Sequence, residues 1–209
     1  LIGEVWLCAG QSNMVMPLNG FDYCPISDSN NVIADAPNHP GIRMVTIKPT
    51  VKLSPQEYAE GSWQQPTTEN APKFSAAAYH YALTLQRTLQ IPIGVITCAW
   101  GGSRVEGWLP KEILQTYKDE DLTLIGSDKT PVYLQSMLMY NGILYPCHKY
   151  TIKGFIWYQG ESNVRSSRTY AERLATMVKH WRSIWKQGDL PFYYVETVPF
   201  ACEYKEDGY

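Results

Sequence analysis

The sequence lacks both the long apolar segments of a membrane protein and the charge excess of a nucleic-acid-binding protein. No run in its 209 residues approaches the roughly 18 apolar residues that a membrane span needs. Charged residues make up 18% and the net charge is −2, so there is no basic surplus of the kind that binds nucleic acid. This balance favours a neutral or weakly charged substrate.

Cysteine is sparse, and the five residues form no CxxC pair; they stand at positions 8, 24, 98, 147 and 202. Such spacing indicates neither a zinc ribbon nor a thioredoxin-like site. An odd number leaves at least one thiol unpaired. Cys8 and Cys98 each lie in an apolar run and are predicted to be small core residues.

The length suits a single domain, which we assign to residues 1–209. Leu1 opens directly into an apolar run, and Glu206–Tyr209 stop on a turn signal rather than on a finished element. We therefore expect this domain to be part of a longer protein and to be incomplete at its C-terminal end.

Four apolar runs enriched in β-branched and aromatic residues are predicted to be strands: 2–9, 91–99, 151–158 and 190–198. Segments 74–89 and 170–185 carry apolar residues at helical spacing, whereas 19–70 is predicted to be mostly loop, with only 42–47 resembling a strand. Strands that are apolar on both faces belong in a parallel sheet covered by helices. The sequence therefore predicts an α/β three-layer sandwich, in which ligands bind at the carboxyl ends of the strands.

Polar turns follow three of these strands: Gly10-Gln11-Ser12-Asn13-Met14, Trp100-Gly101-Gly102-Ser103 and Gln159-Gly160-Glu161-Ser162-Asn163. A Ser at a tight strand-to-helix turn keeps its hydroxyl exposed near its own backbone N–H, which suits a nucleophile beside an oxyanion donor. A Gly pair lets backbone N–H groups approach a ligand, and Gln or Asn adds a side-chain donor. Each turn alone has a simpler explanation as a cap, a turn or a strand end. Three of them together predict a catalytic site.

These strings, extended by Gly3-Glu4-Val5-Trp6-Leu7-Cys8-Ala9, Glu106-Gly107-Trp108 and Trp157-Tyr158, resemble the sialate O-acetylesterase group of SGNH hydrolases, relatives of the family 6 acetylxylan esterases. The resemblance implies a flavodoxin-like SGNH fold with Ser12 as nucleophile. It also implies that the oxyanion is stabilised by the Ser12 N–H, the Gly101-Gly102 turn and the side chain of Gln159 or Asn163. Of the two side chains Gln159 is favoured, because it lies nearer the strand end.

The general base of this family is a His in an Asp-x-x-His motif downstream of the third turn, and residues 164–209 contain no such motif. None of the four histidines is expected to take the role: His39, His80, His148 and His180. His180 falls inside a predicted amphipathic helix, and the other three do not follow a strand. The base and its Asp are expected beyond Tyr209.

Five residues beside the three turns are candidates for substrate binding: Gln11, Gly101, Arg104, Glu161 and Trp108. Arg104, or Arg165 beside the third turn, offers a sialate carboxylate two parallel hydrogen bonds, although a surface pair with a Glu is the commoner role of an Arg. Trp108 either packs against a sugar or caps the core.

The predicted activity is the removal of O-acetyl groups from carbohydrate, with O-acetylated sialic acid ahead of acetylated xylan. This chemistry needs no metal and no organic cofactor. Two alternatives stay open: a general short-chain esterase or thioesterase of the same superfamily, and a sugar-binding module that has lost the base. The sequence shows no signal peptide, and we expect the protein to act in a secreted, periplasmic or lysosomal-type compartment. Its oligomeric state is not fixed by one sequence.

Overall fold

The computed structural model describes residues 2–197, which build a five-stranded sheet with all neighbouring strands parallel. The strands are β1 (Glu4–Gly10), β2 (Ile42–Thr46), β3 (Ile93–Ala99), β4 (Gly154–Tyr158) and β5 (Phe192–Tyr194). Their order across the sheet is β2-β3-β1-β4-β5. This order makes β1 the central strand. Its carboxyl end, and Ser12 shortly after it, therefore lie in the middle of the row formed by the carboxyl ends of the strands, which we call the carboxyl edge of the sheet.

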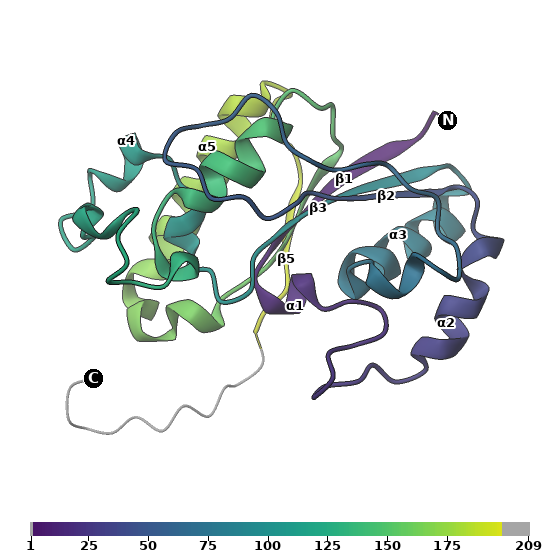
Figure 1. Cartoon of the computed structure of the whole chain (residues 1–209). Helices are drawn as coiled ribbons and strands as arrows, with labels where there is room; N and C mark the ends of the chain where they lie inside the picture. Colours follow the sequence, from purple (N-terminus) through teal and green to yellow (C-terminus); the bar gives the residue numbers. More distant parts are fainter. Residues whose placement is uncertain (1, 198–209) are drawn as a thin grey trace.

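Helices cover both faces of the sheet (Figure 1). On one side lie α1 (Ser12–Val15), α2 (Ser29–Asp35) and α3 (Ala76–Leu89), and on the other lie α4 (Lys111–Leu114) and α5 (Ser167–Trp185). The buried side chains accordingly form two clusters, one for each face. The predicted α/β three-layer sandwich is thereby confirmed. In the part of the chain that the structure describes, no helix combines the length and the apolar character of a membrane span.

The central strands are buried on both faces because successive side chains point into opposite clusters. In β1, Leu7 packs into the cluster beneath α5, whereas Cys8 packs into the cluster beneath α3. Cys8 and Cys98 are both fully buried, as predicted. Burial raises the pKa of the Cys8 thiol to about 12, so this thiol stays neutral and is not a nucleophile at ordinary pH.

The structure departs from the predicted elements at several boundaries. Segment 19–70 contains the short helix α2 in addition to β2, and β4 begins at Gly154 rather than at Thr151. The last predicted strand, 190–198, is shorter in the structure, where β5 spans only Phe192–Tyr194; residue 198 of that prediction lies outside the described residues. Leu89 was predicted on the buried face of its helix but is 43% exposed, because it is the last helical residue and Gln90 then leaves the helix in a left-handed conformation.

Three fully buried tryptophans pack between α5 and the sheet: Trp108, Trp157 and Trp181. Their ring centroids lie 5.6 to 6.4 Å apart in edge-on arrangements. Each indole N–H has an acceptor, in turn the Ser103 hydroxyl, the Tyr170 hydroxyl and the Trp108 carbonyl. The cluster is therefore rigid and free of unpaired polar groups, and it supports the turns that follow β3 and β4 from beneath.

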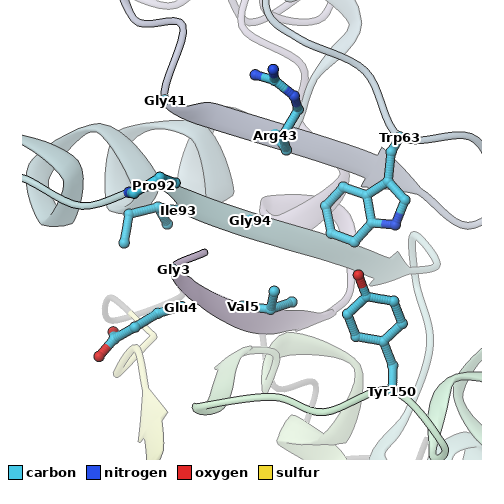
Figure 2. A pocket seen from close by; sticks show the side chains of 10 residues that line it. All are labelled: Gly3, Glu4, Val5, Gly41, Arg43, Trp63, Pro92, Ile93, Gly94 and Tyr150. Carbon is cyan, nitrogen blue, oxygen red and sulfur yellow. The ribbon is translucent and has the colours of Figure 1, made fainter. Parts of the chain in front are cut away.

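A groove of about 370 Å³ lies at the opposite edge of the sheet, where β1 and β3 begin. Figure 2 shows the Trp63 and Tyr150 rings on one side of this groove, with Gly94 on the strand between them. The two ring centroids are 5.7 Å apart. The three polar turns follow the other ends of these strands, so the groove and the turns lie at opposite edges.

Gly10 ends β1 with a φ of +150°, and a Cβ at this position would lie 2.1 Å from the Tyr158 carbonyl oxygen. We expect Gly10→Ala to lower the free energy of unfolding by about 3 kcal/mol, because the methyl group pushes β1 away from β4. Gly188 is the matched control, since it has a φ of +79° but nothing within 4 Å of its Cβ position. Gly188→Ala should cost only about 1 kcal/mol of backbone strain. Urea denaturation measures both, and equal losses would contradict the steric explanation.

Candidate functional site

Ser12 lies directly after the central strand, at the first position of α1. The Gln11 N–H donates to the Tyr158 carbonyl oxygen at 3.0 Å, which fixes the chain before Ser12 against β4. Ser12 is half-buried, and its backbone N–H belongs to the first turn, where a helix has no internal acceptors. Ser12 therefore brings a hydroxyl and a backbone donor to the carboxyl edge of the sheet.

The turn after β3 lies beside Ser12. The Trp100 N–H donates to the Gly10 carbonyl oxygen at 3.0 Å, and a Cβ placed on Gly101 would lie 3.9 Å from the Ser12 Cβ, so the two turns are neighbours. Gly102 has a φ of +75°, and a Cβ there would come within 2.7 Å of the Tyr133 ring. Only glycine combines this conformation with this close approach. The predicted neighbourhood of Ser12 and the Gly pair is thus present in the structure.

The Gln159 side chain bridges the second and third turns. Its Nε2 donates to the Ser103 carbonyl oxygen at 3.1 Å and to the Asn163 Oδ1 at 2.8 Å. Its Oε1 accepts a hydrogen bond from the Tyr170 hydroxyl at 2.9 Å. The residue is buried, and both the NH2 group and the oxygen of its side-chain amide are engaged with protein partners in this structure.

Asn163 is tied more strongly than Gln159. Its Oδ1 accepts from the Val105 N–H at 2.9 Å, and its Nδ2 donates to Glu106 Oε2 at 3.0 Å. A hydrogen bond to a buried carboxylate is charge-assisted and about twice as strong as one to a neutral carbonyl. Breaking its present hydrogen bonds to donate to an oxyanion therefore costs less free energy for the Gln159 amide than for the Asn163 amide.

Two other candidates connect the first turn to the third. Gln11 is buried, and its Oε1 accepts from the Gly160 and Ser162 N–H groups, each at 3.3 Å. Asn13 Nδ2 donates to Glu161 Oε1 at 2.5 Å. In this structure Gln11 and Glu161 hold the two turns together, and contact with a substrate stays a prediction for both.

Arg104 and Trp108 are directed into the protein. The Arg104 guanidinium donates to the Leu134 carbonyl at 3.0 Å and to Glu120 Oε1 at 2.8 Å. These bonds occupy the groups that a sialate carboxylate would need, so the structure favours the structural role for Arg104. Trp108 has no exposed surface, so it is part of the core and is not available to pack against a sugar in this structure. Arg165 is exposed.

A buried cluster of charges lies behind the second and third turns. Glu106 is fully buried and accepts hydrogen bonds from Asn163 and from Arg173 of α5. Arg173 also donates to Asp119 at 2.6 Å and lies 3.5 Å from Glu120. Burial opposes the charge on Arg173, but the bond to Glu106 and the three acidic neighbours raise its pKa above the usual value. The guanidinium therefore stays charged in the core.

Sequence reasoning missed this cluster, although one signal was available. Arg173 lies between Tyr170 and Met177 on the apolar face of α5. A charged residue on such a face is seldom fully buried unless it is paired, so its position indicates an acidic partner in the core. The pattern does not say which of the acidic residues is the partner.

The histidines of the described chain are engaged elsewhere. His39 pairs with Asp35 at 2.8 Å, His148 with the Tyr145 carbonyl at 2.6 Å, and His180 with the Tyr140 hydroxyl at 2.9 Å. His80 is exposed on α3. Within residues 2–197, no histidine forms a hydrogen bond with Ser12, and the location of the general base stays a prediction.

We expect Glu106→Gln to lower the free energy of unfolding by about 3 kcal/mol, because it removes the charge that compensates buried Arg173. Glu172→Gln is the matched control, since Glu172 is an exposed glutamate next to Arg173 on α5. Urea denaturation measures both variants, and Glu106→Gln combined with Arg173→Met should recover part of the loss. Equal small losses in Glu106→Gln and Glu172→Gln would show that the buried pair contributes nothing.

The family model described as "Carbohydrate esterase, sialic acid-specific acetylesterase" matches residues 2–207. The chain is 28% identical over 197 residues to the sialate O-acetylesterases of Pongo abelii and Homo sapiens, with 90% of this chain and 37% of each relative covered. A structure described as a novel carbohydrate acetylesterase from Xanthomonas citri matches with a TM-score of 0.77 and 31% identity, over 92% of this chain and 40% of that chain. The chain spans less than half the length of these relatives. The resemblance carried by the three turns is thus confirmed, and the chain belongs to the family of carbohydrate esterases described as sialic acid-specific acetylesterases.

Proposed function

We propose that this chain carries the nucleophile and the oxyanion donors of a serine esterase that removes O-acetyl groups from carbohydrate, with O-acetylated sialic acid as the first substrate to test. The observation that carries the proposal is that Ser12, at the start of α1, and the Gly101-Gly102 turn lie side by side where β1 and β3 end. Family membership supports the substrate class. A secreted, periplasmic or lysosomal-type compartment, where such glycans occur, is part of the same proposal.

In the proposed reaction a general base takes the proton of the Ser12 hydroxyl while Oγ attacks the acetyl carbonyl carbon. The carbonyl electron pair moves onto oxygen, and the backbone N–H groups of Ser12 and Gly102 stabilise this oxyanion together with a side-chain amide. Collapse expels the sugar oxygen, which receives the proton from the base and leaves acetyl-Ser12. Water then loses a proton to the same base and attacks the acetyl carbon; as the bond to Ser12 Oγ breaks, the base returns the proton to Oγ and acetate leaves.

The general base is proposed to come from chain beyond Tyr209, together with its Asp. The nucleophile and the backbone donors are supplied by the residues described above, because the turns that carry them are held at the carboxyl ends of the strands. The base needs only to reach the Ser12 hydroxyl at hydrogen-bonding distance.

Ser12→Ala tests the nucleophile. In the natural gene product we expect hydrolysis of para-nitrophenyl acetate and of O-acetylated sialic acid to fall at least about a thousandfold, because no other group takes over the covalent step. Ser27→Ala, in an exposed loop, is the control and should keep full activity. Undiminished hydrolysis by folded Ser12→Ala would refute the serine mechanism. A wild-type protein that binds O-acetylated sugar without hydrolysing it would indicate a binding module instead.

Gln159→Ala and Asn163→Ala test the side-chain donor. Gln159 reaches the carbonyl of Ser103, next to Gly102, through a neutral hydrogen bond that can be exchanged for one to the oxyanion. We expect Gln159→Ala to lower kcat about a hundredfold with little change in KM, which is the usual effect of a lost oxyanion donor. Asn163→Ala leaves Glu106 short of a partner and should mainly lower the free energy of unfolding. The opposite pattern, with kcat lost only in Asn163→Ala, would assign the donor to Asn163.

A further inference from the structure

An exposed aromatic side chain, Tyr133, lies against the Gly101-Gly102 turn. A Cβ placed on Gly102 would lie 2.7 Å from the Cδ2 atom of Tyr133, 3.1 Å from its Cε2 and 3.3 Å from its Cγ. Because a Cβ is one bond away from its Cα, the Gly102 Cα is itself in van der Waals contact with the ring. The ring is not enclosed, since 40% of Tyr133 is exposed. One part of the ring therefore covers the turn while another part faces solvent.

The loop that carries Tyr133 is held by hydrogen bonds to two neighbouring segments. Arg104, shortly after the Gly pair in the chain, donates from its Nε to the Leu134 carbonyl oxygen at 3.0 Å. Gln135 is buried, and its side-chain amide makes three hydrogen bonds to backbone groups of residues 126–130. Tyr133 is thus presented by a fixed loop, and a side chain that is already in place loses little conformational entropy when it contacts a ligand.

The position of Tyr133 distinguishes it from other exposed tyrosines, since an exposed aromatic residue by itself is ordinary. Tyr150 has a similar exposed fraction of 45%, but it lies at the opposite edge of the sheet, where β1 and β3 begin (Figure 2). Tyr133 instead contacts the turn whose N–H groups are proposed to stabilise the oxyanion. This turn has Ser12 beside its first glycine and Tyr133 beside its second.

The chemistry of an O-acetyl sugar indicates which part of the substrate reaches this ring. The acetyl methyl group is bonded to the carbon that Ser12 attacks, so it stays next to Ser12. The sugar is joined to the same carbon through the ester oxygen, and it is the part of the substrate large enough to extend along the turn to Tyr133. A pyranose offers an aromatic ring a face of C–H groups, and its hydroxyls can form hydrogen bonds with the phenol hydroxyl.

We propose that Tyr133 packs against the pyranose ring of the O-acetylated sugar, and that it makes the enzyme prefer sugar acetates to acetates of small alcohols. The inference rests on the proposed function of Ser12. It goes beyond that function by naming a residue that recognises the alcohol part of the ester. No local pattern in the sequence marks Tyr133 for this role, because the contact with Gly102 joins two separate loops.

The test compares two esters that carry the same acetyl group. One is an O-acetylated pyranose, with O-acetylated sialic acid first, and the other is ethyl acetate, whose alcohol has no ring. In the natural gene product, kcat/KM for each is measured by the release of acetate. Tyr133→Ala should lower the ratio of sugar ester to ethyl acetate about 3- to 10-fold, mainly through KM, which is the usual value of one aromatic contact.

Two tyrosine variants serve as controls. Tyr133→Phe keeps the aromatic ring and should leave the ratio within about twofold of the wild-type value. Tyr150→Ala removes a tyrosine of similar exposure at the other edge of the sheet and should leave the ratio unchanged. Tyr133→Leu keeps an apolar contact with Gly102 but has no aromatic face, so it should lower the ratio even if Tyr133→Ala fails to fold.

Calorimetry measures sugar binding without turnover. O-acetylated sugar is titrated into Ser12→Ala and into Ser12→Ala combined with Tyr133→Leu, and the second protein should bind about 3- to 10-fold more weakly. Equal losses for the two esters in Tyr133→Ala and Tyr133→Leu would overturn the proposal, because they would show that the ring only supports the oxyanion turn. An unchanged ratio would remove Tyr133 from the sugar site.

The nucleophile is tested separately from Tyr133. If hydrolysis survives in Ser12→Ala, the proposed function itself fails. If Ser12→Ala is inactive while Tyr133→Ala and Tyr133→Leu leave both the ratio and the sugar affinity unchanged, only the role of Tyr133 fails.

Discussion

The buried carboxylate of Glu106 joins parts of the chain that are far apart in sequence. It follows the second turn, accepts a hydrogen bond from Asn163 in the third turn, 57 positions away, and pairs with Arg173 on α5, 67 positions away. A charge in the core is tolerated only when its hydrogen bonds and its counter-charge are in place. The relative position of the second and third turns, and with it the surroundings of Ser12, therefore depends on this group together with the Gln159 side chain that bridges the same turns.

The first turn is held by close backbone approach in addition to the hydrogen bonds of Gln11 and Glu161. Gly10 lets the end of β1 approach the Tyr158 carbonyl, and the Trp100 N–H donates to the Gly10 carbonyl, which holds the next turn beside it. Beneath the turns, Trp108 belongs to an aromatic cluster whose indole N–H groups are all paired. Close backbone approach above and a rigid core below together hold the nucleophile without the need for a long loop.

The two edges of the sheet differ in what they offer a ligand. The amino-terminal edge has a wide groove with the aromatic side chains Trp63 and Tyr150, whereas the carboxyl edge has Ser12, the Gly pair and a smaller pocket lined in part by Val15 and Gly101. Backbone N–H groups converge where parallel strands end and turns begin, so the stabilisation of a developing negative charge is available at the carboxyl edge. This difference is why the chemistry is proposed there and not at the larger groove.

The sequence by itself determined the parallel sheet, the two long helices and the place of Ser12 and the Gly pair at neighbouring strand ends. These features follow from local patterns, because alternating burial, helical spacing and turn residues act over a few positions. Only the tertiary structure decided that Arg104 pairs with Glu120, that Trp108 lies in the core, and that Glu106 meets Arg173. Each of those contacts joins distant segments, and the low dielectric of the core selects partners that no local pattern encodes.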